Sequence, residues 1–198
     1  TASRLFNAAL KLDITNPDLQ FLNGLSYHLQ GVEGDSAKFE LAEQGFSRAL
    51  KFDPGHLAAR YQLGLLYMDQ RRYDYAQGMF TKVALHRPDD PTVLYNLAAS
   101  SYYARDPRTA EAALKHLARV APEMAQRPEI LRAAAMSKAA VNDQAAAAGL
   151  LAAYRSRVAD PIKVRGLENR LRGWNAFYDH DARVLLAQSN PYGGSNPY

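Results

Sequence analysis

Apolar and small residues follow a helical pattern along most of the chain, most clearly over 57–90, LAARYQLGLLYMDQRRYDYAQGMFTKVALHRPDD. Gly64 and Ala76 are small enough to let two antiparallel helices touch, while Tyr67 and Phe80 can fill the space between them. The proline near the end of the stretch cannot continue a helix, so the second helix is expected to end before it. The pattern therefore predicts two antiparallel helices that pack along one face.

The order of these residues resembles the tetratricopeptide repeat (TPR), which has small, aromatic and proline residues at these places and a period of about 34 residues. The residues that carry the resemblance are Leu63-Gly64, Tyr67, Ala76, Phe80 and Pro88. The resemblance implies an all-α fold, a right-handed TPR superhelix (α-α solenoid) in which each repeat contacts only its neighbours. Abundant alanine and scarce β-branched residues also favour helix.

Further copies of the pattern divide the chain. We predict the second helix of a truncated TPR at 1–16, a TPR with a loop insertion at 17–54, TPRs at 57–90 and 91–124, a degenerate TPR at 128–160, capping helices at 161–188 and a flexible tail at 189–198. The insertion is expected at 30–36, QGVEGDS, where two glycines predict a loop and Asp35 or Ser36 predicts an N-cap.

The first segment matches only the second half of a repeat. Ala2, Phe6, Ala9 and Leu10 fall where a second helix carries its small residue, its aromatic residue and its packing pair. Because the first helix of this repeat is missing, the apolar face of the segment is expected to be partly uncovered. This predicts upstream repeats in the parent protein, or contact with another chain.

The C-terminal segment is predicted to cap the array. Val164, Leu167, Leu171 and Trp174 recur at spacings of three or four, as on one side of an amphipathic helix. The resemblance implies a solvating cap helix here, and 181–188 is expected to add a short helix. The last ten residues, SNPYGGSNPY, are typical of a flexible linker.

In TPR arrays the first helix of each pair lines the concave face, so the resemblance indicates where a ligand would bind. The predicted groove residues are Phe21, Leu25, His28, Tyr61, Leu65, Met68, Tyr95, Asn96 and Tyr102. Aromatic and thioether side chains of this kind can hold an extended peptide or an amphipathic helix. Alternatively, some of the tyrosines pack within their own repeats, or the C-terminal helix fills the groove. The Lys, Asn and Arg clamp of chaperone-binding TPRs is not matched, since only Asn96 agrees in kind.

The positive charge of the chain belongs to its second half. Residues 1–100 carry 10 basic and 11 acidic residues, whereas residues 101–198 carry 14 and 9. Arg165, Arg170 and Arg172 lie on the polar side of the predicted cap helix and are candidates for contact with an acidic protein. The other interpretations are a solvated helix face, or binding of nucleic acid or lipid.

Catalytic and metal-binding patterns are absent from the sequence. The chain has no cysteine, its five histidines are scattered, and no phosphate-binding glycine loop or nucleophile motif is present. Asp179-His180-Asp181 is the densest group of possible metal ligands, and an Asp-rich helix start is its ordinary interpretation. We therefore expect no enzyme activity, no cofactor and no metal site. No apolar run has the roughly 20 residues that a membrane span needs.

These observations predict a protein-protein interaction scaffold or adaptor that binds a peptide or helix in the concave groove. Proteins of similar composition in the family suggest a role in assembling a bacterial envelope, secretion, pilus or polysaccharide-export machine. The compartment is then the bacterial periplasm or cytoplasm, with the envelope favoured. The alternatives are a self-assembly module that uses the uncovered N-terminal helix, and a polyanion-binding module that uses the basic C-terminal helix.

Overall fold

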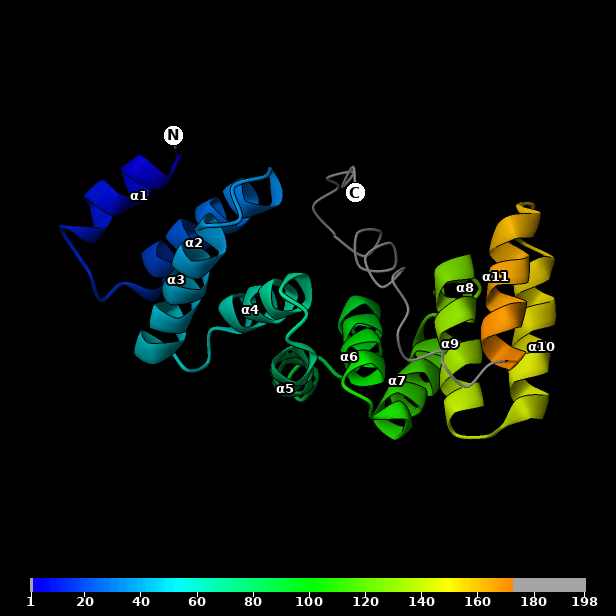
Figure 1. Cartoon of the computed structure of the whole chain (residues 1–198). Coiled ribbons are helices and arrows are strands. Elements are labelled where there is room, and N and C mark those ends of the chain that lie inside the picture. Colours follow the sequence, from blue (N-terminus) through cyan, green and yellow to red (C-terminus); the bar gives the residue numbers. More distant parts are fainter. Residues whose placement is uncertain (1, 173–198) are drawn as a thin grey trace. The chain divides into compact units, whose positions relative to one another are not determined.

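The computed structural model of the chain describes residues 2–172, and all regular structure in that part is α-helical (Figure 1). The chain forms two compact units, Thr1–Val83 and Ala84–Tyr198. Predicted features at 173–198, including Trp174 and the His180 group, lie outside the described residues.

Unit 1 consists of one single helix followed by two helix pairs. Its helices are α1 (Ala2–Leu10), α2 (Pro17–Val32), α3 (Lys38–Phe52), α4 (Leu57–Asp69) and α5 (Tyr73–Ala84). Helix α2 packs against α3. Helix α1 contacts α2, and α4 contacts both α3 and α2. Helix α4 packs against α5, because Gly64 of α4 lies directly against the ring of Phe80.

Unit 2 continues the same alternation. Its helices are α6 (Pro91–Tyr103), α7 (Pro107–Val120), the short α8 (Pro122–Ala125), α9 (Pro128–Ala140), α10 (Gln144–Arg155) and α11 (Pro161–Arg172). Helices α6 and α7 form one pair and α9 and α10 the next, and α11 lies against both α9 and α10. The core contains Tyr102, Ala110, Leu131, Met136, Tyr154 and Leu167. The described part of the predicted cap is thus one helix, α11.

Polar side chains set the starts of these helices. The Asn16 side chain accepts a hydrogen bond from the backbone N–H of Leu19 at the start of α2, at 3.1 Å. Asp90 caps α6 in the same way, accepting from Thr92 and Val93. Because a side-chain oxygen satisfies N–H groups that have no partner within the helix, these residues fix where each helix begins.

Three of the turns within helix pairs share one backbone conformation. Arg71, Arg105 and Asn142 have φ values of 59°, 63° and 63°, in the left-handed region. Each directly follows the C-cap residue of a first helix, and the next backbone N–H reaches back to that helix. Arg72, for example, donates to the carbonyl of Tyr67 at 2.8 Å. This is a Schellman-type end, which makes the turn short and reverses the chain sharply.

The predicted loop at 30–36 is wrong in its bounds, and so is the predicted N-cap. Helix α2 continues to Val32, the connection spans 33–37, and Ala37 precedes α3 without a side-chain cap. The insertion mainly lengthens helices: α2 has 16 residues, whereas α4 has 13. Gly31 in this extension touches Phe39 of α3, where a Cβ atom would lie 2.5 Å from the ring. The added residues are therefore held by packing against α3.

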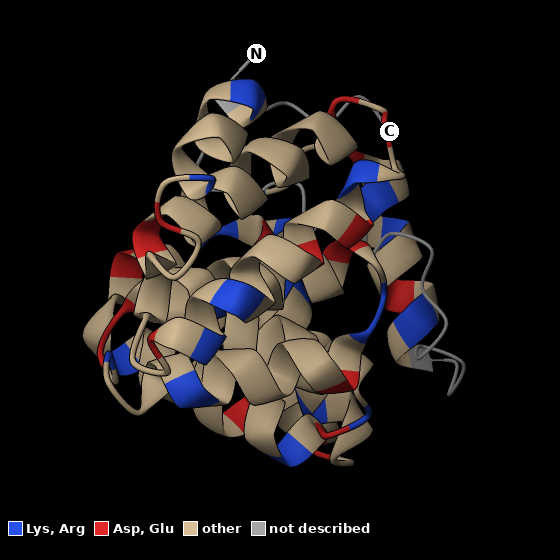
Figure 2. Cartoon of the chain, turned by 90° about the vertical axis from the view of Figure 1, so that its left-hand side faces the viewer, with Lys and Arg blue, Asp and Glu red and all other residues tan. Residues whose placement is uncertain are grey.

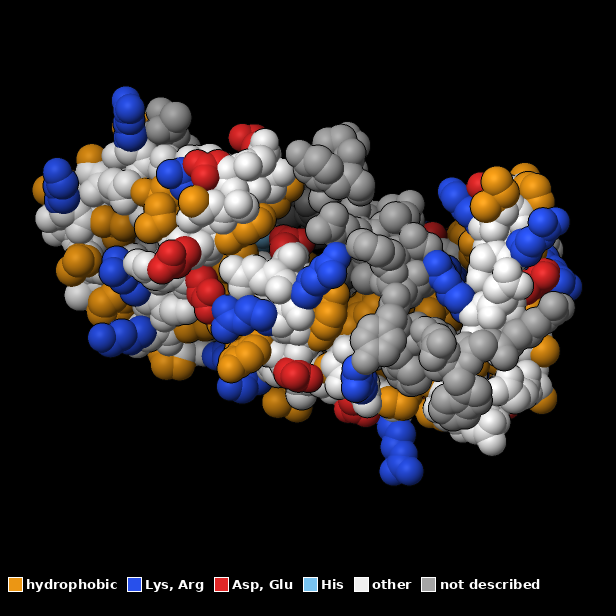
Figure 3. Space-filling view, viewed as in Figure 1, with side chains coloured by type: hydrophobic (Ala, Val, Ile, Leu, Met, Phe, Trp, Pro, Cys, Tyr) orange, Lys and Arg blue, Asp and Glu red, His pale blue; other side chains and the backbone are white. Residues whose placement is uncertain are grey.

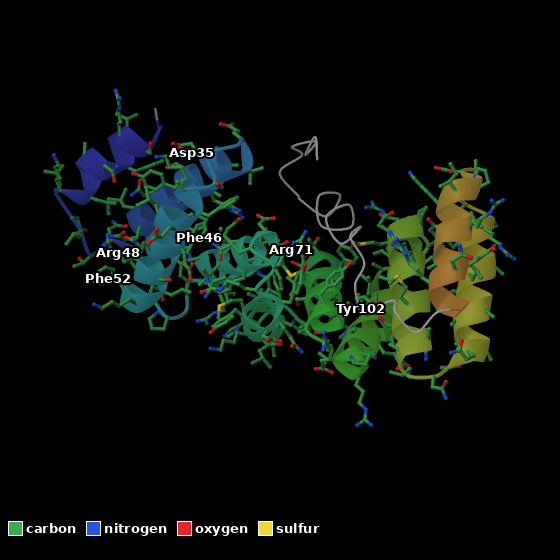
Figure 4. All side chains as sticks on the ribbon, viewed as in Figure 1. Asp35, Phe46, Arg48, Phe52, Arg71 and Tyr102 are labelled. Atoms are coloured by element: carbon green, nitrogen blue, oxygen red, sulfur yellow. The ribbon has the colours of Figure 1, made fainter. Side chains whose placement is uncertain are left out.

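Small residues bring α2 and α3 into close contact. A Cβ atom on Gly45 would lie 2.6 Å from the Cα atom of Gly24, so the two backbones cross with only hydrogen atoms between them. The ring of Phe46, which is fully buried, lies beside Gly24 in the same crossing (Figure 4). Gly64 and Phe80 repeat this arrangement between α4 and α5. The glycine and aromatic positions of the repeat therefore have the packing roles that the sequence indicates.

Candidate partner-binding surface

The first helices of the two complete pairs in unit 1 share one register. Gly24 of α2 and Gly64 of α4 occupy the same place, since each lies against the phenylalanine of its own second helix. Counting from these glycines pairs the predicted residues as Phe21 with Tyr61, Leu25 with Leu65, and His28 with Met68. We call the side of α2 and α4 that carries these six residues the first-helix face.

The two aromatic residues of the first-helix face are half-buried by packing within unit 1. The ring of Phe21 lies 6.0 Å from that of Phe46 and 5.0 Å from that of His56, between ring centroids. The ring of Tyr61 meets Phe80 edge-on at 5.6 Å. One side of each ring therefore belongs to the interior, and contact of the remaining exposed part with a ligand stays a prediction.

Leu25 and Leu65 are aliphatic members of the first-helix face that keep exposed surface. Both are only partly buried, although the residues directly before and after each of them in the helix are buried. Met68 and His28, by contrast, are buried. The first-helix face thus carries a partly open leucine at the same register of two successive first helices.

Two His–Asp pairs connect α2 to α4. The Nε2 atom of His28 lies 2.9 Å from a carboxylate oxygen of Asp69, at the far end of α4. The Nε2 atom of His56, the residue that caps α4, lies 3.2 Å from a carboxylate oxygen of Asp18. The sequence analysis placed His28 in the groove but missed both carboxylate partners, because neither pair is close in sequence.

A cluster of an arginine, a glutamate and two tyrosines connects α3 to α4 and α5. The guanidinium of Arg72 donates to both carboxylate oxygens of Glu43 at 2.9 Å, and its carbon lies 4.4 Å and 4.6 Å from the ring centroids of Tyr67 and Tyr75. The Tyr67 hydroxyl also donates to Glu43 at 3.1 Å. Burial, together with the Glu43 carboxylate, raises the pKa of Tyr67 to about 12. Of these residues the sequence analysis had singled out only Tyr67.

In unit 2 the predicted residues Tyr95, Asn96 and Tyr102 are buried. Tyr102 belongs to the core of the unit and meets Tyr103 edge-on at 5.3 Å. Burial raises the pKa of Tyr102 to about 12, and burial with the nearby Glu129 raises the pKa of Tyr95 above its ordinary value. The structure thus gives these side chains packing roles, and their contact with a ligand stays a prediction.

Comparison with known proteins identifies the repeat. A family model described as tetratricopeptide repeat matches residues 35–101, which include α3, the α4–α5 pair and most of α6. The rest of the described chain continues the same alternation of helices. Residues 35–101 are therefore a tetratricopeptide repeat region, and the fold of the described chain is that of TPR proteins. No curated protein sequence matches it.

Several solved TPR structures have the same fold. YrrB, described as a TPR protein with an unusual peptide-binding site, has a TM-score of 0.69 at 15% identity, over 96% of this chain and 94% of that chain. MamA 41-end from Desulfovibrio magneticus RS-1 has a TM-score of 0.65 at 17% identity, over 84% of this chain and 84% of that chain. PilF of Pseudomonas aeruginosa has a TM-score of 0.62 at 17% identity, over 92% of this chain and 78% of that chain. The predicted all-α TPR solenoid is therefore confirmed.

An ion pair joins α10 to α11, the helix that carries the predicted basic residues. Arg155 of α10 pairs with Glu168 of α11, its Nε atom donating at 2.8 Å. Arg165 is exposed and Arg170 is half-buried, while the side chain of Arg172 lies outside the described residues. Figure 2, in which the α1 end of the chain faces the viewer, shows basic and acidic residues scattered among one another in that part of the chain. Contact of Arg165 or Arg170 with an acidic partner stays a prediction.

The described residues of the TPR array contain no group of three His, Asp or Glu side chains placed to hold a metal ion. None of the helices in 2–172 is both long and apolar enough to cross a membrane. TPR arrays of this kind are scaffolds for protein partners, whose binding surface comes from the stacked repeats.

Proposed function

We propose that this chain is a non-catalytic adaptor that binds a peptide or an amphipathic helix of a partner protein on the first-helix face of unit 1. The observation that carries the proposal is the matched, partly open pair Leu25 and Leu65. Exposed apolar side chains are common singly, but these two lie at the same register of successive first helices, and we call the pair the apolar strip. Such a strip suits the apolar side chains of an extended or helical ligand.

The half-buried aromatic rings support the same proposal. Phe21 and Tyr61 flank the strip, and their packing against Phe46 and Phe80 holds them rigidly. A rigid aromatic side chain loses little conformational entropy on binding, so it contributes more affinity than a mobile one. Most of the binding energy is then expected from a few central residues of the first-helix face.

For the biological role, we propose assembly of a bacterial envelope, secretion, pilus or polysaccharide-export machine. The support is that solved structures of the same fold include proteins of Pseudomonas aeruginosa and Desulfovibrio magneticus, together with a TPR protein described by its peptide-binding site. At identities of 15–17% the likeness concerns the fold, so the partner has to be identified directly.

A pair of charge-introducing variants on α4 tests the proposed surface. Ala58 and Leu65 lie on one side of the helix, seven residues apart, and both keep exposed surface. The double variant Ala58→Glu/Leu65→Glu should keep its helicity and lose at least about tenfold in affinity for the partner, because two carboxylates would be buried in an apolar contact. The measurement is capture of proteins from a lysate of the source organism, followed by titration of the retained protein.

The matched control is Leu41→Glu, which changes an exposed leucine on the second helix α3. It should bind the partner as the unchanged chain does. Equal retention by the double variant and the control would reject the first-helix face. If the partner protein were instead lost when Arg165 is substituted, the basic C-terminal helix would be supported as the site.

A further inference from the structure

Two histidines hold an aspartate at each end of the contact between α2 and α4. Asp18, in the first turn of α2, contacts His56, which caps the start of α4. Asp69, the last residue of α4, contacts His28 near the end of α2. Because one pair joins the two starts and the other joins the two ends, α2 and α4 run side by side in the same direction. The first-helix face therefore has one carboxylate at each end.

Both aspartates lie on the side of the helices that carries the apolar strip. Asp18 comes seven residues, or two turns, before Leu25, and Asp69 comes four residues, or one turn, after Leu65. The register of α2 and α4 differs by 40 residues, so Asp69 corresponds to position 29, eleven positions after Asp18. At 1.5 Å per residue the two carboxylates are separated by roughly 16 Å along the helices. The apolar strip thus lies between two acidic positions at a defined spacing.

Each aspartate is oriented by its histidine and keeps exposed surface. The side chains of Asp18 and Asp69 are 81% and 39% exposed, whereas those of His56 and His28 are 10% and 9% exposed. The imidazole contacts one carboxylate oxygen, and within residues 2–172 the second oxygen of each aspartate has no hydrogen-bond partner. A neutral imidazole donates one N–H group, so it can orient a carboxylate without cancelling its charge. Each pair therefore presents an oriented negative charge at the surface.

The first helices of unit 1 place no basic side chain beside these carboxylates. Asp18 is the only Asp, Glu, Lys or Arg residue of α2, and α4 adds Arg60 and Asp69. Arg60 is five positions before Leu65, on another side of the helix, and its guanidinium donates to the carbonyl of Pro54. In the described part of the chain neither aspartate pairs with a lysine or an arginine. Figure 3 shows acidic residues next to hydrophobic ones at the surface of unit 1.

We propose that the partner segment on the first-helix face is an amphipathic helix with a Lys or Arg residue at each end of its apolar side, eleven residues apart. Asp18 and Asp69 select this segment by charge, and its apolar residues contact Leu25 and Leu65 between them. The inference rests on the proposed function and specifies the chemistry of the partner. Charge complementarity carries it, because two oriented carboxylates frame an apolar strip that has no positive charge of its own.

The surroundings of the strip favour a helix over an extended segment. An extended peptide needs hydrogen-bond partners for its backbone, and the side chains of Phe21, Leu25 and Leu65 offer none. A helix satisfies its own backbone groups and needs only side-chain contacts. Two parallel helices lying side by side also form a groove along their axes, in which the ridges of a third helix can pack.

A displayed library of helical peptides is the probe. Leucine is fixed along one side of the helix and all other positions are random. Selection on the intact chain should enrich helices with two Lys or Arg residues eleven positions apart on the leucine side. Binding of a selected helix, made as a peptide and measured by fluorescence anisotropy, should weaken as salt is added, because ion pairs at a surface are screened. Selected helices without this charge pattern would overturn the proposal.

The variant Asp18→Asn/Asp69→Asn tests the two carboxylates. Asparagine keeps a side-chain oxygen that can accept from the histidine, so the fold should be retained while both charges are lost. Affinity for the selected peptide should fall about fivefold, and its salt dependence should disappear. Glu40→Gln/Glu44→Gln is the matched control, since it removes two exposed charges from the second helix α3 and should leave binding unchanged. Equal affinities of the two double variants would contradict selection by Asp18 and Asp69.

Leu65→Gln separates this inference from the proposed function, because it changes the apolar strip and leaves the net charge as it is. All selected helices should bind this variant about tenfold more weakly. Helices that bind it as tightly as the unchanged chain, or a selection that returns no helix, would reject the proposed function together with the inference. Helices weakened by Leu65→Gln but indifferent to Asp18→Asn/Asp69→Asn would leave the proposed function standing and overturn the charge selection alone.

Discussion

At the scale of single residues, the clearest structural requirement is the absence of a side chain at Gly45. A Cβ atom there would meet backbone atoms of Gly24 at 2.6 Å and 2.8 Å, and backbone cannot rotate away as the end of a side chain can. We predict that Gly45→Ala lowers the free energy of unfolding by about 2 kcal/mol, because α2 and α3 must separate. Chemical denaturation of the purified variant measures this.

Gly78→Ala on α5 is the matched control, because nothing lies within 4 Å of the added Cβ atom. Alanine favours helix over glycine, so this variant should be more stable by about 0.5–1 kcal/mol. The same substitution is thus expected to act in opposite directions at two helical glycines. Destabilisation of similar size at both positions would contradict the close crossing of α2 and α3.

Residue roles were predictable where the repeat pattern determines them. The sequence identified Gly64 and Phe80 as contact residues between the helices, since that role follows from size and spacing. It could not identify the His28–Asp69 pair, because the two residues are 41 positions apart and meet only through the stacking of α2 on α4. The sequence likewise could not show that Tyr102 lies in the core of unit 2 and not in the groove, since a tyrosine suits either location.

At the scale of elements, the turn between α4 and α5 has a conformation that its residue disfavours. Arg71 has a φ of 59°, which costs a residue with a Cβ atom about 1 kcal/mol or more, and it is exposed at the end of α4 (Figure 4). We predict that Arg71→Gly raises the free energy of unfolding by about 0.5–1 kcal/mol. Arg71→Ala, measured in the same denaturation experiment, should bring no gain, because alanine has the same steric cost. A similar gain in both variants would place the effect in the side chain of Arg71 instead.

The insertion in the α2–α3 pair illustrates where element prediction fails. Gly31 and Gly34 both suggested a loop. Only Gly34, with a φ of 124°, lies in the connection, whereas Gly31 is helical and packs against Phe39. A glycine that allows close helix contact and a glycine that ends a helix look the same in sequence, so the bounds of the loop required the structure.

At the scale of the whole molecule, the repeat pattern predicted the all-α solenoid because each repeat packs mainly against its neighbours. The binding surface was less predictable, because it depends on which first-helix residues remain open after their own repeats have packed. Leu25 and Leu65 were part of the predicted set, but their partial exposure distinguishes them from buried members such as Met68 only in the structure.

Site-specific crosslinking is the most direct test of the claim that the first-helix face of unit 1 binds a partner protein. A photoreactive phenylalanine analogue would replace Leu65 in the full chain, and Leu41 in a control chain, in cells of the source organism. Illumination should give one discrete adduct with another protein from position 65 and none from position 41. No adduct from position 65, or the same adducts from both positions, would contradict the account.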